Sequence, residues 1–143
     1  EERGLAYTVY SSISAFIDTG YLMVYAATRP GGGQEVLDQI RGELGSIRDL
    51  PVDDQELKGA RDHLKGSLML SLESSSSRMS NLARQDIYYG RQFSLDEIIA
   101  GVDRVTVEDV QALARALLAG GDCTVAVLGN LASLDLSPDR IRF

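Results

Sequence analysis

The side chains that could do chemistry are few, and their spacing does not bring them together. His63 is the only histidine of the 143 residues, which excludes a metal site built on two or more histidines of this chain. Its place at the edge of an apolar helical stripe favours an ordinary helix-boundary residue. Cys123 is the only cysteine, and its position in the apolar run 123–128 predicts a buried structural thiol. Neither residue indicates a self-contained active site.

Two runs of small residues share features with known motifs but lack the residues that would complete them. Gly31–Gly33 has neither the spacing of a dinucleotide fingerprint nor the Gly-Lys-Ser/Thr ending of a phosphate-binding loop, which favours a connector. The serine run 74–77 has no base and no Gly-x-Ser-x-Gly context, so helix capping is favoured over nucleophilic catalysis. The acidic pairs at 53–54 and 108–109 fall in first helical turns, where carboxylates meet the helix dipole favourably. We interpret all of them as structural.

The composition excludes some classes of partner. The formal net charge is −7 at pH 7, whereas nucleic-acid binding relies on clustered Lys and Arg, so we expect no nucleic-acid partner. No apolar run approaches the roughly 18 residues of a membrane-spanning helix, and we expect no membrane partner. Localisation stays open, with the cytoplasm as the default expectation.

The length of 143 residues suits one domain whose core is built from side chains alone. A strand-like run begins within five residues of Glu1, with no initiator Met and no signal peptide before it. We interpret residues 1–143 as a single domain that is truncated at its N-terminus.

Three segments are predicted to be strands. Residues 5–16 alternate between apolar and polar side chains, and residues 21–28 are rich in aromatic and aliphatic side chains. The short turn between them predicts an antiparallel hairpin. Residues 123–128 are apolar on both parities, which predicts an interior strand.

Between the hairpin and the last predicted strand, helical spacing predicts five helices. Asp53 with Glu56 resembles a capping box, and Ser94 with Glu97 forms a clearer one. The serine run and Thr106 are further expected helix starts. Because the strands are segregated from the helical block, the order predicts an α+β fold, a two-layer sandwich with a mainly antiparallel sheet packed against helices.

Several short motifs follow one another in a fixed order and together cover nearly the whole chain. They are Arg3-Gly4-Leu5-Ala6-Tyr7, Ser77-Arg78-Met79, the segment 84–91, the segment 103–110 and the segment 124–129. In this order they resemble the pitrilysin/insulinase superfamily, and within it the branch of the mitochondrial processing peptidase and its bacterial relatives.

The resemblance implies a processing-peptidase-like metallohydrolase fold. In that family an inverted zinc motif, His-x-x-Glu-His, lies in an N-terminal domain, where two histidines and a distal Glu hold the metal and the motif Glu is the general base. This sequence lacks the motif. It therefore resembles the C-terminal, non-zinc domain, which has the same α+β fold and closes a peptide chamber.

The family's C-terminal domain contributes an Arg and a Tyr seven residues apart that hydrogen-bond the substrate near the scissile carbonyl. Tyr7 matches the Tyr, so the resemblance implies that Tyr7 is the catalytic site residue, a donor where negative charge develops. The matching Arg would fall one residue before Glu1, and Arg3 is at the wrong spacing to replace it. Strand parity places Tyr7 with Val9 and Ile13, which favours packing unless that face looks into the chamber or a bulge re-aims the side chain.

These observations lead to the hypothesis of a C-terminal substrate-binding domain of a zinc-dependent endopeptidase. Zinc and general base would come from the N-terminal zinc domain of the same protein or from a partner subunit, and this chain alone, without cofactor or metal ligands, would be inactive. The substrate would be a peptide. The alternative is a non-catalytic structural or regulatory subunit of the same family. A third interpretation is an unrelated α+β interaction domain, and open strand edges favour a possible homodimer.

Overall fold

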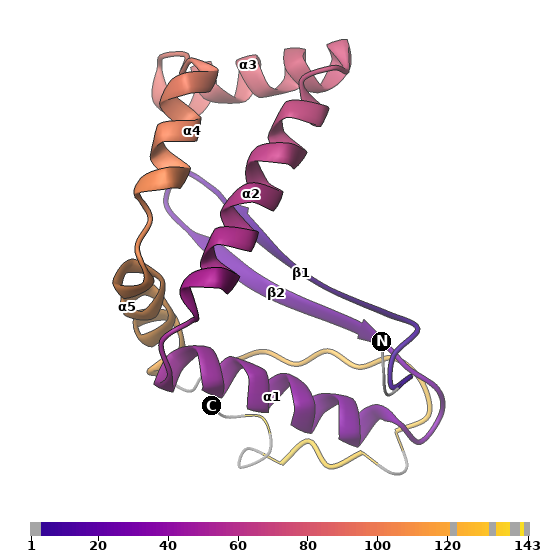
Figure 1. Ribbon diagram of the computed structural model, residues 1–143. Coiled ribbons are helices and arrows are strands. Elements are labelled where there is room, and N and C mark those ends of the chain that lie inside the picture. The colour runs from indigo at the N-terminus through magenta and orange to yellow at the C-terminus, as the bar shows by residue number, and fades with distance from the viewer. Residues whose placement is uncertain (1–3, 121–122, 132–133, 138–140, 142–143) are drawn as a thin grey trace. The chain divides into compact units, whose positions relative to one another are not determined.

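The computed structural model describes residues 4–120, 123–131, 134–137 and 141 (Figure 1). Contacts divide the chain into two units, one of Glu1–Leu50 with Leu113–Phe143 and one of Pro51–Ala112. Within the described residues, two strands are followed by five helices. The α+β class and the predicted order of a hairpin followed by five helices are confirmed.

In the first unit, β1 (Thr8–Ala15) and β2 (Gly20–Ala27) form the predicted antiparallel hairpin. Their register runs from Thr8 opposite Ala27 to Ala15 opposite Gly20. The turn between them is closed by the Phe16 amide, which donates to the Thr19 carbonyl at 2.8 Å. Tyr10 and Tyr25 face each other across the ladder, and their rings stack with centroids 5.1 Å apart. The hairpin is therefore held by its own ladder and by this cross-strand pair.

The helix α1 (Gly33–Asp49) follows the hairpin in the same unit. Two contacts join it to segments that are distant in sequence. Arg115 of α5 (Val107–Leu118) donates through Nε to the Arg48 carbonyl at 3.4 Å. The Asp135 amide donates to Oε1 of Gln34 at 2.9 Å. Both ends of α1 are thus tied to the C-terminal part of the chain.

The prediction of an interior strand at residues 123–128 is wrong. In the part of the chain that the structure describes, these residues belong to no strand, and the sheet consists of β1 and β2. Cys123 is exposed instead of buried, and its thiol donates to the Ile141 carbonyl at 2.7 Å. An apolar run becomes an interior strand only when neighbouring strands satisfy its amides and carbonyls, and here no described strand does so.

The second unit contains α2 (Asp54–Ser71), α3 (Ser75–Tyr89) and α4 (Leu95–Arg104). Their starts are the predicted capping residues, because the side chains of Asp53, Ser74 and Ser94 each accept a hydrogen bond from a first-turn amide. Ser94 forms the full capping box with Glu97, whereas Asp53 accepts from the Gln55 amide at 2.7 Å. Local side-chain chemistry therefore fixes where these helices begin.

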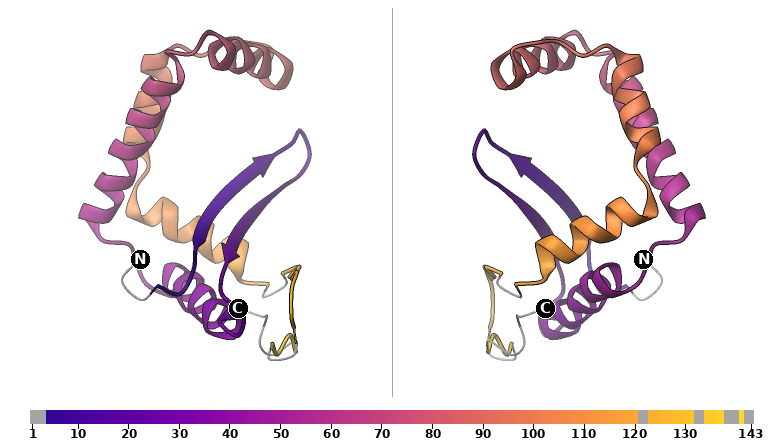
Figure 2. Two further views of the ribbon diagram at one scale, coloured as in Figure 1. Left: turned by 90° about the vertical axis from the view of Figure 1, so that its right-hand side faces the viewer. Right: turned by 90° about the vertical axis from the view of Figure 1, so that its left-hand side faces the viewer.

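Helices α2 and α4 lie side by side, as Figure 2 shows. Lys65 of α2 is placed between two carboxylates, 2.9 Å from Asp103 and 3.2 Å from Asp62. These two ion pairs raise the pKa of Lys65. Arg61, one turn earlier, donates to the carbonyl of Val105. Polar contacts along one edge thus fix the pairing of the two helices.

The apolar helical stripe next to His63, which lies on α2, is buried only in part. Leu57 is 8% exposed, whereas Leu64, two turns later, is 58% exposed. Ala114 of α5 is the other apolar residue that counts as buried among the described residues. Burial therefore gathers near the start of α2 and in the middle of α5.

Candidate functional site

The approach to β1 presents Tyr7 to solvent. The residue lies in a bend directly before the strand, and 79% of its surface is exposed. Its amide donates to the Ala27 carbonyl at 2.7 Å, so its backbone continues the ladder by one hydrogen bond. The phenol is thus carried on a fixed backbone and is free to reach another molecule.

The residues before Tyr7 are also held in place. The hydroxyl of Thr28 donates to the Leu5 carbonyl, which ties this segment to the end of β2. Gly4 adopts a φ of +56°, a conformation that side-chain-bearing residues rarely tolerate. The glycine and the threonine together set the path by which the chain enters the hairpin.

By strand parity, Tyr7 belongs to the same face of the hairpin as Val9 and Ile13, and this face is exposed in the structure. Val9 is 63% exposed and Ile13 is 77% exposed, although alternation predicts a half-buried strand. A hairpin face becomes buried only when another layer packs on it, and sequence alternation does not say which layer that is. The burial expected for this face is not found, and the phenol of Tyr7 is accessible.

The other residues with chemical potential do not assemble into a metal site. His63 is an exposed residue of α2. Among the described residues, no three His, Cys, Asp or Glu side chains gather so that they could hold a metal ion. Arg3 lies outside the described residues.

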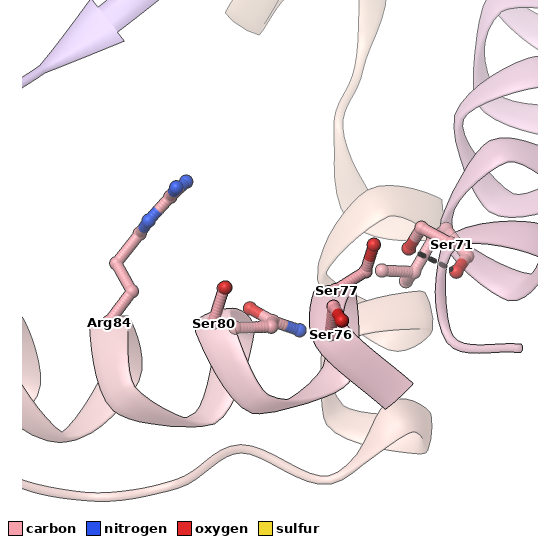
Figure 3. Close-up of a pocket in the computed structure, with 7 residues that line it drawn as sticks. Ser71, Ser76, Ser77, Ser80 and Arg84 are labelled. Carbon is pink, nitrogen blue, oxygen red and sulfur yellow. Dashed lines mark hydrogen bonds between the residues drawn. The ribbon is translucent and has the colours of Figure 1, made fainter. Parts of the chain in front are cut away.

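A groove between the end of α2 and the start of α3 was not predicted. Its volume is about 450 Å³, it opens widely to solvent, and six of its seven lining residues have polar side chains. Ser77, Ser80 and Arg84 project from one side of α3 into it (Figure 3). Their spacing of i, i+3 and i+7 places them on one helical face, and this spacing is the signal by which the sequence could have revealed the groove.

The buried amide of Gln85 fixes the amide group of Asn81 at this groove. Gln85 is 7% exposed, and its Nε2 donates to Oδ1 of Asn81 at 3.4 Å. Its Oε1 accepts a hydrogen bond of 2.7 Å from the Phe93 amide. One side chain therefore links the groove to the corner between α3 and α4.

That corner carries a compact set of charges. The guanidinium of Arg91 lies 3.8 Å from the centre of the Phe93 ring and 3.2 Å from Oε1 of Glu97. Hydrogen bonds from the Ser94 amide, and then from Arg91, lower the pKa of Glu97. The corner is thus ordered by a capping box, an ion pair and a cation–π contact.

Known proteins share both the sequence and the fold. A family model described as "Peptidase M16 inactive domain" matches residues 1–64. An uncharacterized zinc protease of Mycobacterium leprae is 40% identical over 142 residues, which is 99% of this chain and 32% of that protein. The chain belongs to the pitrilysin/insulinase superfamily. Within that superfamily, the chain corresponds to the C-terminal domain.

The superfamily branch is indicated by a second relative. The β subunit of the mitochondrial-processing peptidase of Saccharomyces cerevisiae is 26% identical over 136 residues, 94% of this chain and 29% of that subunit. A chain of complex III2 from Candida albicans has the same fold, with a TM-score of 0.75 at 20% identity over 82% of this chain and 28% of that chain. The chain spans about a third of the length of the curated relatives it matches. The superfamily that the sequence motifs suggested is thereby confirmed.

No helix within the described residues of this pitrilysin-superfamily domain combines the length and the apolar character needed to cross a membrane.

Proposed function

We propose that residues 1–143 form one C-terminal, substrate-binding domain of a zinc-dependent endopeptidase. Zinc and general base are supplied by an N-terminal domain of the same protein or by a partner subunit. The observation that carries the proposal is the 40% identity to a zinc protease over 99% of the chain. The described residues do not fit a zinc ion themselves, because no group of suitable ligands is present among them.

In this proposal Tyr7 contacts the peptide substrate. A phenol donates a hydrogen bond to a carbonyl oxygen, and the bond strengthens as negative charge develops on that oxygen. The accessibility of the phenol and the hydrogen bond from the Tyr7 amide to the Ala27 carbonyl support this role. A donor on a fixed backbone needs no reorganisation when the reaction occurs, which is why such a position suits catalysis.

The test is Tyr7→Phe in the full-length protein, assayed on a quenched fluorescent peptide. We expect kcat to fall by about 10²- to 10³-fold while KM changes little, because the lost bond matters most in the transition state. Tyr10→Phe is the matched control, since it removes a phenol hydroxyl from the same hairpin and keeps the ring that stacks on Tyr25. An unchanged kcat for Tyr7→Phe refutes the proposed role.

The proposal that another domain supplies zinc and the general base has its own test. The 143-residue chain alone should neither bind zinc tightly nor cleave peptides, and addition of the N-terminal domain should restore cleavage. Zinc binding with peptidase activity by the chain alone contradicts the proposal.

A non-catalytic subunit of the same family is the second candidate. The description of the matching family model as an inactive domain fits this candidate as well as the first. A full-length protein that has no His-x-x-Glu-His motif, and that hydrolyses no peptide with any partner subunit, would establish this candidate in place of the first.

A further inference from the structure

The groove between α2 and α3 combines neutral hydrogen-bonding groups with one cation. Its lining contains four serines, Asn81 and Arg84, with Leu68 as the apolar contribution and no Asp or Glu. The salt bridges between described residues do not involve Arg84, which is exposed. In a chain of net charge −7, this groove offers a guanidinium with no acidic neighbour in its lining.

The order of these groups along α3 indicates what they suit. Ser77 and Arg84 are separated by about 10 Å along the helix axis, at 1.5 Å per residue. An extended peptide covers that distance with about three residues. Hydroxyl and amide groups both donate and accept, as the alternating N–H and C=O groups of a peptide main chain require, whereas a guanidinium pairs with a carboxylate.

The hydroxyl groups of Ser77 and Ser80 are not used by the N-cap of α3. Ser74, outside the groove lining, supplies the N-cap of α3. Ser71 donates to the Leu68 carbonyl at 2.7 Å, while Ser77 contributes only its amide to the cap hydrogen bond. Figure 3 shows Ser77, Ser80 and Arg84 reaching outward from α3 on the same side. Their side chains are therefore accessible to one ligand at the same time.

We propose that this groove binds a short extended peptide segment that ends in a free C-terminal carboxylate. Arg84 pairs with the carboxylate, and Ser77, Ser80 and Asn81 contact the main chain. The groove is built within residues 51–112, and the proposal does not depend on the role of Tyr7. Either inference can therefore fail without the other.

The test follows backbone and Arg side-chain resonances of the 143-residue chain during titration with acetyl-trialanine. We expect chemical-shift changes at Ser77, Ser80 and Arg84 when the peptide with a free C-terminal carboxylate binds. The same peptide with a C-terminal amide should bind about three- to fivefold more weakly, because it lacks one exposed charge pair. Acetyl-Ala-Glu-Ala amide, whose only carboxylate is on a side chain, should bind more weakly than acetyl-trialanine, and equal or tighter binding of this probe overturns the proposal. Sodium acetate, which has a carboxylate but no peptide main chain, should bind more weakly than acetyl-trialanine.

Two variants make the result specific to the groove. Arg84→Gln should weaken binding of the carboxylate peptide about three- to fivefold and abolish its preference over the amide. Arg78→Gln, which removes an exposed guanidinium of the same helix outside the groove lining, should leave both unchanged. Equal binding of carboxylate and amide, an equal loss in both variants, or acetate binding as tightly as the peptide overturns the proposal.

Discussion

The hairpin of β1 and β2 and the helices of residues 51–112 are held by different kinds of contact. The hairpin relies on its ladder, the Tyr10–Tyr25 stack and two hydrogen bonds at its entry, and large side chains on both of its faces are exposed. The helices rely on side chains that bond nearby backbone groups, such as Ser94 and Gln85. Local hydrogen bonds from side chains are enough to define where a helix begins. A hairpin face, by contrast, is buried only when another layer packs on it. This contrast leads to four expectations, which begin in the helical unit.

The largest effect is expected at the corner that Gln85 holds. Gln85→Leu keeps a buried side chain of similar size but leaves the Phe93 amide without its acceptor, and we expect a loss of about 1–3 kcal/mol in local stability. Hydrogen exchange of the α3 and α4 amides measures this loss. Gln39→Leu, which removes an exposed hydrogen bond to Glu43 on α1, should change stability by less than about 0.5 kcal/mol. Unchanged exchange in Gln85→Leu would contradict the assignment of this residue as the link.

The next effect concerns the start of α4. Ser94→Ala removes the hydroxyl that accepts from the Glu97 amide at 3.2 Å and should destabilise the helix by about 1 kcal/mol. Ser46→Ala is the control, because the Ser46 hydroxyl only donates to the Gly42 carbonyl within α1. Urea unfolding followed by circular dichroism compares the two variants. An equal cost for both would mean that the capping box adds nothing.

In the hairpin, the expected effect is smaller and confined to the strands. Tyr25→Thr keeps a residue suited to strands but loses the ring that stacks on Tyr10, which should cost about 0.5 kcal/mol. Exchange of the β1 and β2 amides should accelerate while that of the α3 and α4 amides stays constant. Val9→Thr, on the other face, should leave the strands unchanged. Equal acceleration in strands and helices would break the contrast between the two regions.

The smallest effect appears only in acid. The pKa of Glu97 is lowered in the folded chain by the Ser94 amide first and Arg91 second, so its contribution is complete above its ordinary pKa of 4.5 and disappears as pH falls through the lowered folded value. Stability of α4 should therefore decline with acidification below pH 4.5. Glu97→Gln should flatten this decline, whereas Glu35→Gln on α1 should preserve it. Side-chain carbon resonances of Glu97 measure the titration directly.

The parts of the fold that the sequence predicts are those decided within a few residues. Ser94 with Glu97 and Thr106 with Asp109 form reciprocal hydrogen bonds three residues apart, and both helix starts are confirmed. The burial of Cys123 and of the face that carries Ile13 was predicted wrongly, because burial depends on which layer covers a segment. The residues next to Cys123 or Ile13 in the sequence do not indicate which layer covers them.

The candidate sites divide in the same way. Tyr7 could be named only through the family resemblance, since its parity alone indicates packing, and its role stays a prediction. The serine run was interpreted entirely as helix capping, which holds for Ser74, while Ser76 and Ser77 line the groove instead. Gln85 escaped notice because a buried polar residue in a polar stretch has no periodic pattern.

The side chain of Gln85 connects the groove with the corner between α3 and α4 through two hydrogen bonds. Its amide touches Asn81 at the groove with one end and the Phe93 amide with the other. A ligand that pulls on Asn81 would turn this amide and alter the hydrogen bond of Phe93, eight residues further along the chain. We therefore expect the proton resonance of the Phe93 amide to shift when the groove is occupied, and to stay unchanged in Gln85→Leu.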